Sequence, residues 1–353
     1  MPNIEITGSG HVDRGDSAFP TLVQLDDGDI VCGFNRGGGA HANGGTHCAR
    51  SSDGGRTWEY QSVILERTED PVKSNHLRLS RTADGTILAY GQRDQTIPTP
   101  DGGNCPHACE PVLCRSIDGG RSWSAPVLVP FHIPGPYEIS NPIVVTSEGH
   151  WLAPTATFHD GRYGELVVIH ESLDEGATWP NMHTVFKDPG SGIGYLEQKL
   201  IETEPGNLMA VAWIQDFGND TDLKNQYSFS SDGGHTWDGP FPTGIQGQTM
   251  TPVWLGDDRY LIVYNKRFGD QSVQMCLVRA SGSSWTIDFE GTLFDGQAKL
   301  ELSDEISSQE QIGLIKFGYP MGMRLDDSTM LTVHWCEEDG VCGIRWTRLH
   351  MDW

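Results

Sequence analysis

The sequence is short of basic residues. Its 353 residues include only 24 lysines and arginines against 48 aspartates and glutamates, which leaves a formal net charge of −24 at pH 7. A nucleic-acid-binding protein needs a basic surface to neutralise phosphates, and docking to an anionic membrane needs one as well. We therefore expect neither a nucleic-acid partner nor a membrane partner, and the acidic surface most simply promotes solubility.

Long apolar segments and a recognisable leader are also missing. No run of about 18 uncharged apolar residues occurs, which is the length that a membrane span requires. The first residues, MPNIEITGSGHVDRGD, lack the basic and apolar regions of a signal peptide. Eight cysteines are scattered along the chain, and without an export signal we expect reduced thiols and a cytoplasmic location.

Turn-forming residues, by contrast, are abundant. The chain has 43 glycines and 20 prolines, and one octapeptide recurs at intervals of about 60 residues, as in a repeat architecture. Its aspartate can accept hydrogen bonds from nearby backbone N–H groups, its fifth-position glycine permits a positive φ, and its tryptophan fills the seam beside the turn. We interpret the motif as structural rather than catalytic. The copies are SSDGGRTW (51–58), SIDGGRSW (116–123), SLDEGATW (172–179) and SSDGGHTW (230–237), with a worn fifth copy that ends at Trp285.

A second repeat covers the full length of the chain. Each copy is a β-branched and aromatic run, a turn and a second such run, which predicts a β-hairpin. A further strand pair, joined at the octapeptide, follows most copies, so each unit of about 60 residues carries about four strands. The six hairpins span residues 21–34, 77–91, 142–156, 199–213, 251–265 and 322–335.

Six four-stranded units arranged radially make a six-bladed β-propeller. We therefore predict an all-β fold, with one domain over residues 1–353 built from four-stranded antiparallel blades. Helical periodicity of note is lacking. We expect the last blade to be completed by residues 346–353, or by the N-terminal segment IEITGSG.

The octapeptides resemble the Asp-boxes, or BNR repeats, of the sialidase (neuraminidase) superfamily, and this resemblance covers essentially the whole chain. It implies a six-bladed propeller whose active site lies on the face opposite the boxes. In a propeller, the starts of the innermost strands and the ends of their hairpin partners lie on one face, where polar residues suit hydroxyl-rich ligands, although strand ends are polar in any case. The candidates are Asp16, His76, Glu138, Glu197, Gln248 and Tyr319 at the starts, and Arg36, Arg93, Asp94, His159, Gln215 and Arg267 at the ends.

Glu197 is the strongest single candidate. It is a lone acid beside apolar neighbours at the start of an inner strand, in YLEQKLIE, and would face the axis. The resemblance implies that a glutamate here polarises a nucleophilic tyrosine, and Tyr319 in GYPMGMRLDD matches the position of that tyrosine. A phenol needs a neighbouring carboxylate as base to attack an anomeric carbon. The resemblance also implies a substrate-contacting role for Arg36, beside the loop GGGAHANGG, which would act as a gate.

The chain departs from the sialidase pattern at the arginines that clamp the sialic-acid carboxylate. Ala18-Phe19-Pro20 stands where the resemblance implies Arg-Ile-Pro, and Gln248 stands where it implies an arginine. Trp213-Ile214-Gln215 replaces a third arginine, and an acid/base aspartate after the first hairpin is not evident. Because Ala and Gln cannot make bidentate charge-assisted hydrogen bonds, we do not expect sialic-acid hydrolysis by the usual machinery.

Three chemistries remain open. In the first, Glu138 and Glu197 form the acid/base and nucleophile pair of a glycosidase, which resembles the glutamate pair of the exo-arabinanases, with Asp16 and Asp94 as reserve acids. In the second, the protein is a polysaccharide lyase acting on uronates, in which cations neutralise the uronate carboxylate and a histidine or tyrosine removes the C5 proton. The residues available for this chemistry are His76, His159, Tyr319, Arg93 and Arg267. In the third, the protein is a carbohydrate-binding propeller without catalysis.

We expect no cofactor and no metal ion. Cys105-Pro106-His107-Ala108-Cys109, followed by Cys114, has one zinc-like spacing, but a second ligand pair is not evident. Cys336 and Cys342 can face each other across a hairpin. We predict an exo-acting glycoside hydrolase for non-reducing-end sugars of oligo- or polysaccharides, with a carbohydrate as its partner and the chain as a monomer or small homo-oligomer.

Overall fold

The β-branched runs pair as antiparallel hairpins around the predicted turns. Between β2 (Ser17–Gln24) and β3 (Ile30–Arg36), the Gly28 amide donates to the Leu25 carbonyl at 3.0 Å, and Gly28 itself has φ +86°. A computed structural model describes residues 2–98, 104–159, 162–300 and 315–353. Within these ranges, the helical structure is one short 3₁₀ turn, Gly39–His41, and no helix is long and apolar enough to cross a membrane.

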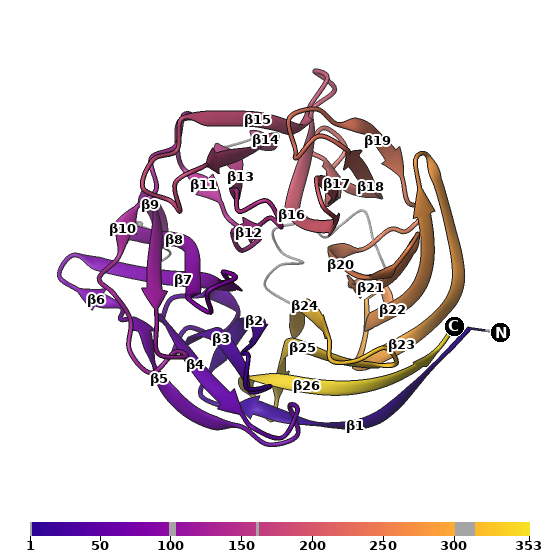
Figure 1. Ribbon diagram of the computed structural model, residues 1–353, viewed down its shortest axis with the longest axis horizontal. Coiled ribbons are helices and arrows are strands. Elements are labelled where there is room, and N and C mark those ends of the chain that lie inside the picture. The colour runs from indigo at the N-terminus through magenta and orange to yellow at the C-terminus, as the bar shows by residue number, and fades with distance from the viewer. Residues whose placement is uncertain (1, 99–103, 160–161, 301–314) are drawn as a thin grey trace.

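Six sheets surround a central axis, and the chain passes once around the ring (Figure 1). Blade one contains β2, β3, β4 (Gly45–Ser51) and β5 (Glu59–Leu65). Blade two contains β6 (Thr68–Glu69), β7 (Val72–Arg81), β8 (Ile87–Pro98), β9 (Asn104–Ser116) and β10 (Val127–Leu128). Blade three contains β11 (Tyr137–Glu138), β12 (Val144–Val145), β13 (Trp151–His159), β14 (Arg162–Ser172) and β15 (Asn181–Lys187).

Blades four to six have four strands each, as blade one has. Blade four contains β16 (Ile193–Glu204), β17 (Asn207–Asp216), β18 (Thr221–Ser230) and β19 (Asp238–Pro242). Blade five contains β20 (Gln248–Gly256), β21 (Arg259–Lys266), β22 (Gly269–Ser281) and β23 (Ser284–Leu300). Blade six contains β24 (Phe317–Arg324), β25 (Thr329–Glu338), β26 (Val341–Asp352) and β1 (Asn3–Asp13). The predicted all-β, six-bladed propeller is confirmed.

Both terminal segments complete the last blade, where the sequence left a choice between them. β26 follows β25, and the N-terminal β1 pairs with β26 as the fourth strand, so the two ends of the chain lie side by side in Figure 1. The register places Ile4 opposite Met351 and Gly10 opposite Trp346. The first strand of the sequence thus closes the ring against the last.

The core lies between neighbouring blades rather than around the axis. Each of six buried clusters combines side chains of two adjacent sheets; for example, Leu200 of blade four packs with Ile169 of blade three. Each sheet therefore buries its apolar side chains against the facing side of the neighbouring sheet.

The octapeptides form the turns between the last two strands of blades one to four. In the first copy, Asp53 Oδ1 accepts the Arg56 and Thr57 amides, both at 2.9 Å, and Gly55 has φ +83°. A Cβ on Gly55 would lie 2.6 Å from Leu331 of blade six, so the glycine is also required by blade packing. These turns share one face with the first hairpin turns, opposite the starts of the inner strands.

Candidate functional site

Four innermost strands carry the same irregularity near their starts. Each has a register shift, and within it one non-glycine residue with a positive φ between 46° and 57°. A bulge redirects side chains, and strained backbone of this kind is found at functional sites. These four residues contact each other in pairs across blades. The rings of Phe19 and Tyr319 lie 5.6 Å apart, and Thr249 donates a hydrogen bond to Glu197.

Glu138 and Glu197 are held together although they belong to different blades. The Glu197 amide donates to Glu138 Oε1 at 2.8 Å, and the Ser140 hydroxyl donates to the same oxygen at 2.6 Å. Glu138 Oε2 is buried and has no hydrogen-bond partner among the described residues. Burial, together with the charge of Glu197, raises the pKa of Glu138 to about 7. The Glu197 carboxylate accepts a hydrogen bond from Thr249.

Tyr319 forms a buried floor next to this pair. Its side chain is only 1 % exposed, and its hydroxyl donates to the Ser140 carbonyl. Arg78 Nε donates to the phenol oxygen at 2.7 Å, and Lys199 Nζ lies 3.8 Å from the ring centroid while also donating to the Ser140 carbonyl. Burial lowers the pKa of Lys199, against the opposing effects of Tyr319 and Glu197. The tyrosine proton therefore points to a backbone carbonyl rather than to Glu197.

A polar chain from blades four and five approaches Glu197 from another side. Arg267 donates to Gln248 Oε1 at 2.5 Å, and Gln248 Nε2 donates to Asp222 at 2.8 Å. Burial lowers the pKa of Arg267 to about 10, and the charges of Glu197 and Asp222 oppose this shift. Gln215 is 7 % exposed and pairs with Asp222 in the β17–β18 ladder. The chain brings the Arg267 guanidinium close enough to Glu197 for the two charges to interact.

Of the two candidates in blade two, Asp94 is linked to the glutamate pair through Gln92, whereas Arg93 points away from it. Gln92 accepts the Ile139 amide at 2.9 Å and donates to Asp94 at 2.9 Å, so Asp94 is linked to the strand of Glu138. Burial raises the pKa of Asp94. Arg93, the next residue along the strand, points to the opposite sheet face and pairs with Glu110 at 2.6 Å.

His76 lies beside the floor. Its ring is 5.7 Å from that of Phe19, its carbonyl accepts Arg78 Nη1 at 2.9 Å, and burial with the charge of Arg78 lowers its pKa well below the usual value. Its Nδ1 is buried and has no partner within the described part of the chain. A neutral imidazole here can accept or donate one hydrogen bond to a ligand.

The remaining candidates lie at the margin of this group. Asp16 is exposed, has φ +58°, and its carbonyl accepts the amides of residues 37–39. Arg36 lies 3.5 Å from Asp13 and 5.2 Å from the Tyr60 ring. His159 ends β13, next to residues 160–161, which lie outside the described ranges. The structure thus gathers Glu138, Glu197, Tyr319, His76, Gln248 and Arg267, with Asp94 one hydrogen-bonded residue away.

Sequence reasoning missed Arg78, Lys199 and Thr249. Arg78 and Lys199 are at most 2 % exposed and contact the floor, while Thr249 holds Glu197. One signal was present, since each is a polar residue within an inner strand of the predicted hairpins. Alternation alone does not say whether such a residue faces the axis or solvent.

The cysteines whose side chains the structure describes do not form a second site. The side chains of Cys105 and His107 lie outside the described residues. Cys109 Sγ contacts the Tyr137 carbonyl at 3.8 Å. Cys336 and Cys342 are free thiols, because their register is offset by one residue and Cys336 lies opposite Gly343.

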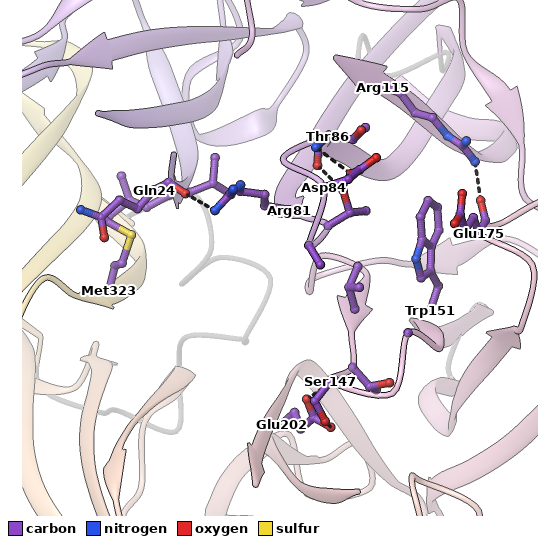
Figure 2. A pocket seen from close by; sticks show the side chains of 17 residues that line it. Gln24, Arg81, Asp84, Thr86, Arg115, Ser147, Trp151, Glu175, Glu202 and Met323 are labelled. Atoms are coloured by element: carbon purple, nitrogen blue, oxygen red, sulfur yellow. Dashed lines mark hydrogen bonds between the residues drawn. The ribbon is translucent and has the colours of Figure 1, made fainter. Parts of the chain in front are cut away.

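A cavity of about 740 Å³ lies on the other face, among the hairpin turns and the third octapeptide (Figure 2). Arg115 there donates to the Glu175 carbonyl at 2.6 Å and lies 5.0 Å from the Trp151 ring. None of the predicted site residues lines this cavity. The glutamate pair and the cavity thus occupy opposite faces of the ring.

Comparison with known proteins identifies relatives of this chain. It is 28 % identical to a sialidase of Micromonospora viridifaciens over 241 residues, which are 62 % of this chain and 35 % of the sialidase. It is 27 % identical to a sialidase of Bacteroides fragilis over 180 residues, 46 % of this chain and 32 % of that one. The chain spans about a third of the length of these two relatives.

Solved structures share the fold along the whole chain. A protein of unknown function from Dyadobacter fermentans superimposes with a TM-score of 0.78 at 21 % identity, covering 100 % of both chains. An α-L-arabinanase of Penicillium chrysogenum, complexed with arabinobiose, gives 0.66 at 15 % identity, covering 97 % and 98 %. The BNR repeat-like domain model matches residues 98–329, and the chain belongs to this family of repeat propellers, with sialidases among its distant homologues.

Proposed function

We propose that this protein is an exo-acting glycoside hydrolase in which Glu138 is the acid/base and Glu197 the nucleophile. The observation that carries the proposal is the carboxylate pair itself. Glu138 has a pKa of about 7, and one of its oxygens is buried and has no partner among the described residues. Its other oxygen accepts the backbone amide of Glu197. A carboxyl group that keeps its proton near neutral pH, next to a second carboxylate, is what acid/base glycoside cleavage requires.

Each residue has a defined part in this mechanism. Glu138, protonated on Oε2, gives its proton to the leaving glycosidic oxygen while Glu197 attacks the anomeric carbon. Water then attacks the anomeric carbon and releases Glu197, while Glu138 removes a proton from that water and regains its acid form. Because the acid must begin protonated, kcat/KM should fall as pH rises through about 7.

Exo action is supported by what lies under the pair. Tyr319, Arg78 and Lys199 are each at most 2 % exposed and make a closed layer. A chain end fits above such a layer, whereas a polymer cannot thread through it. Sialidases among the relatives, and an arabinanase that binds arabinobiose among the structural neighbours, support a carbohydrate substrate.

The test uses Glu138→Gln and Glu197→Gln, with Glu204→Gln as the matched control. Glu204 ends the strand that carries Glu197 but is exposed and far along it. On a panel of aryl glycosides, arabino-oligosaccharides and sialosides, we expect each site variant to lose at least about 100-fold in kcat while the control is unchanged. Normal turnover by Glu197→Gln, with its folded circular dichroism spectrum retained, would refute the proposal.

One observation favours a second route in which Tyr319 is the nucleophile. Arg78 donates to its phenol oxygen, and Lys199 lies over its ring. Tyr319→Phe separates the routes, because loss of a nucleophile abolishes turnover, whereas loss of a floor hydroxyl lowers it modestly. Uronate polymers in the same panel, read for unsaturated products, test the lyase alternative, and binding without turnover by the wild type would indicate a carbohydrate-binding propeller.

A further inference from the structure

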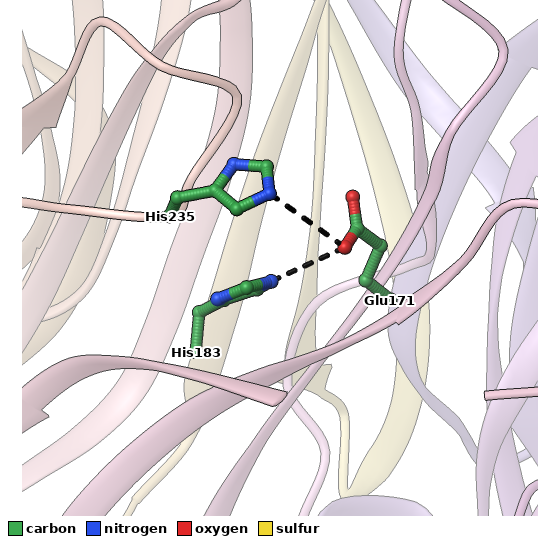
Figure 3. A group of neighbouring side chains, drawn as sticks. All are labelled: Glu171, His183 and His235. Carbon is green, nitrogen blue, oxygen red and sulfur yellow. Dashed lines mark hydrogen bonds and ion pairs between the residues drawn. The ribbon is translucent and has the colours of Figure 1, made fainter. Parts of the chain in front are cut away.

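Two histidines and a glutamate meet between blades three and four, away from the carboxylate pair (Figure 3). Glu171 lies in β14, His183 in β15, and His235 in the fourth octapeptide. Glu171 Oε2 is 3.2 Å from His183 Nε2 and 4.0 Å from His235 Nε2. One ligand atom from each residue lies within 4.8 Å of the others.

These separations suit a shared metal ion. Tetrahedral Zn²⁺ with ligands about 2.0–2.1 Å away holds neighbouring ligand atoms roughly 3.3 Å apart. The contact between Glu171 and His183 already has this spacing, and His235, whose side chain is 49 % exposed, has room to close the remaining gap. Two imidazoles and a carboxylate are ligands that zinc accepts, with water in the fourth position.

The glutamate is held in place by further polar groups. Its side chain is 1 % exposed; His150 Nδ1 contacts Oε1 at 3.0 Å and Asn181 donates to Oε2 at 3.0 Å. Such outer contacts orient a ligating carboxylate.

The fourth octapeptide differs from the others in a way that frees a ligand atom. In the first two copies, Arg56 and Arg121 donate Nη1 to the carbonyls of Asp53 and Asp118, both at 2.7 Å. His235 Nδ1 makes the same contact to the Asp232 carbonyl at 2.5 Å. Donation from Nδ1 selects the tautomer whose lone pair is on Nε2, the atom that faces Glu171.

We propose that Glu171, His183 and His235 bind one divalent transition-metal ion of the zinc class. The ion would join β14 and β15 of blade three to the octapeptide turn of blade four. Its role is structural, because the cluster lies on the octapeptide face, opposite the carboxylate pair. Binding to the native state alone would stabilise the ring.

His235→Arg is the sharpest test, because it restores the residue of the first two octapeptides and keeps the contact to Asp232 while removing a ligand. His350→Arg is the matched control, at a histidine of similar exposure, 44 %, in β26. After chelator treatment, ZnCl₂ titration of the wild type and the control should give one ion per chain and a raised Tm. His235→Arg should bind at least about 10-fold more weakly and show no rise in Tm.

Co²⁺ reports the ligand type. We expect tetrahedral d–d bands without a thiolate charge-transfer band in the wild type, lost in His235→Arg. The proposal is overturned if the wild type binds no Zn²⁺ at micromolar concentration, if His235→Arg binds like the control, or if thiolate bands reveal a cysteine site instead.

Discussion

Glu138 shows how one residue's surroundings decide its chemistry. Ser140 and the Glu197 amide occupy one carboxyl oxygen, and the other is buried without a partner in the described structure. Its desolvation and the nearby carboxylate both disfavour the charged form. An acid that holds its proton near neutral pH is the result.

This shift makes a prediction about stability. The pKa of Glu138 is about 7 in the folded protein against 4.5 for an ordinary glutamate, so the folded state binds the proton more tightly. The stabilisation is complete below pH 4.5 and is lost as pH rises through 7. Between pH 4.5 and 8, the wild type should lose roughly 2 to 3 kcal/mol more unfolding free energy than Glu138→Gln. Urea unfolding at each pH measures this difference.

Other groups also titrate between pH 4.5 and 8 and change the unfolding free energy of both proteins. The effect of Glu138 is therefore the difference between the unfolding free energies of the wild type and Glu138→Gln at each pH. Parallel pH profiles for wild type and Glu138→Gln would show that Glu138 has an ordinary pKa. The acid role proposed for it would then lose its physical basis.

At the scale of the element, the octapeptide turn is a self-contained hydrogen-bonded unit. In the second copy, Asp118 Oδ1 accepts the Arg121 and Ser122 amides at 3.0 and 2.9 Å. The Ser122 hydroxyl hydrogen bond is the main cause that lowers the pKa of Asp118 to about 2. The turn therefore depends on the charged form of one aspartate.

We predict that Asp118→Ala lowers the unfolding free energy by about 1–3 kcal/mol, because several amides lose their acceptor. Ile117→Ser is the control; Ile117 is 89 % exposed, and Ser52 and Ser231 occupy the equivalent position in two other copies. Denaturant midpoints measure both. Equal midpoints for the two variants would contradict the structural role given to the aspartate.

At the scale of the whole molecule, six sheets are joined sideways and the ring is closed by β1 on β26. Gly10 lies against the indole of Trp346, and a Cβ added to Gly10 would be only 2.9 Å from Nε1 of that ring. A Cβ on Gly8 would have ordinary contacts of 3.6 Å with the same ring. The closing strand is thus fitted to one side chain of the last blade.

Gly10→Ala should therefore destabilise the protein by about 1–3 kcal/mol through overpacking, whereas Gly8→Ala should change stability little. Thermal unfolding of the two variants measures the contrast. A loss of Tm in Gly8→Ala as large as that in Gly10→Ala would show that the Trp346 contact does not control closure.

The sequence by itself determined the blades, the turns and the family. Hairpins around 25–29 and the octapeptide at 51–58 are local structures, so residues close in sequence carry all the necessary hydrogen bonds. The positions of Glu138, Glu197 and Tyr319 at inner-strand starts followed from this periodicity. Their catalytic roles remain predictions.

Only the tertiary structure decided which polar groups meet. Ser140 receives Tyr319 and Lys199 from two other blades, and His235 faces Glu171 across a blade boundary. Such contacts depend on the rotation between neighbouring sheets and on bulges that redirect side chains, and both are set by packing between distant segments. A chain's local pattern therefore predicts the ring, while the chemistry inside it depends on how the blades are fitted together.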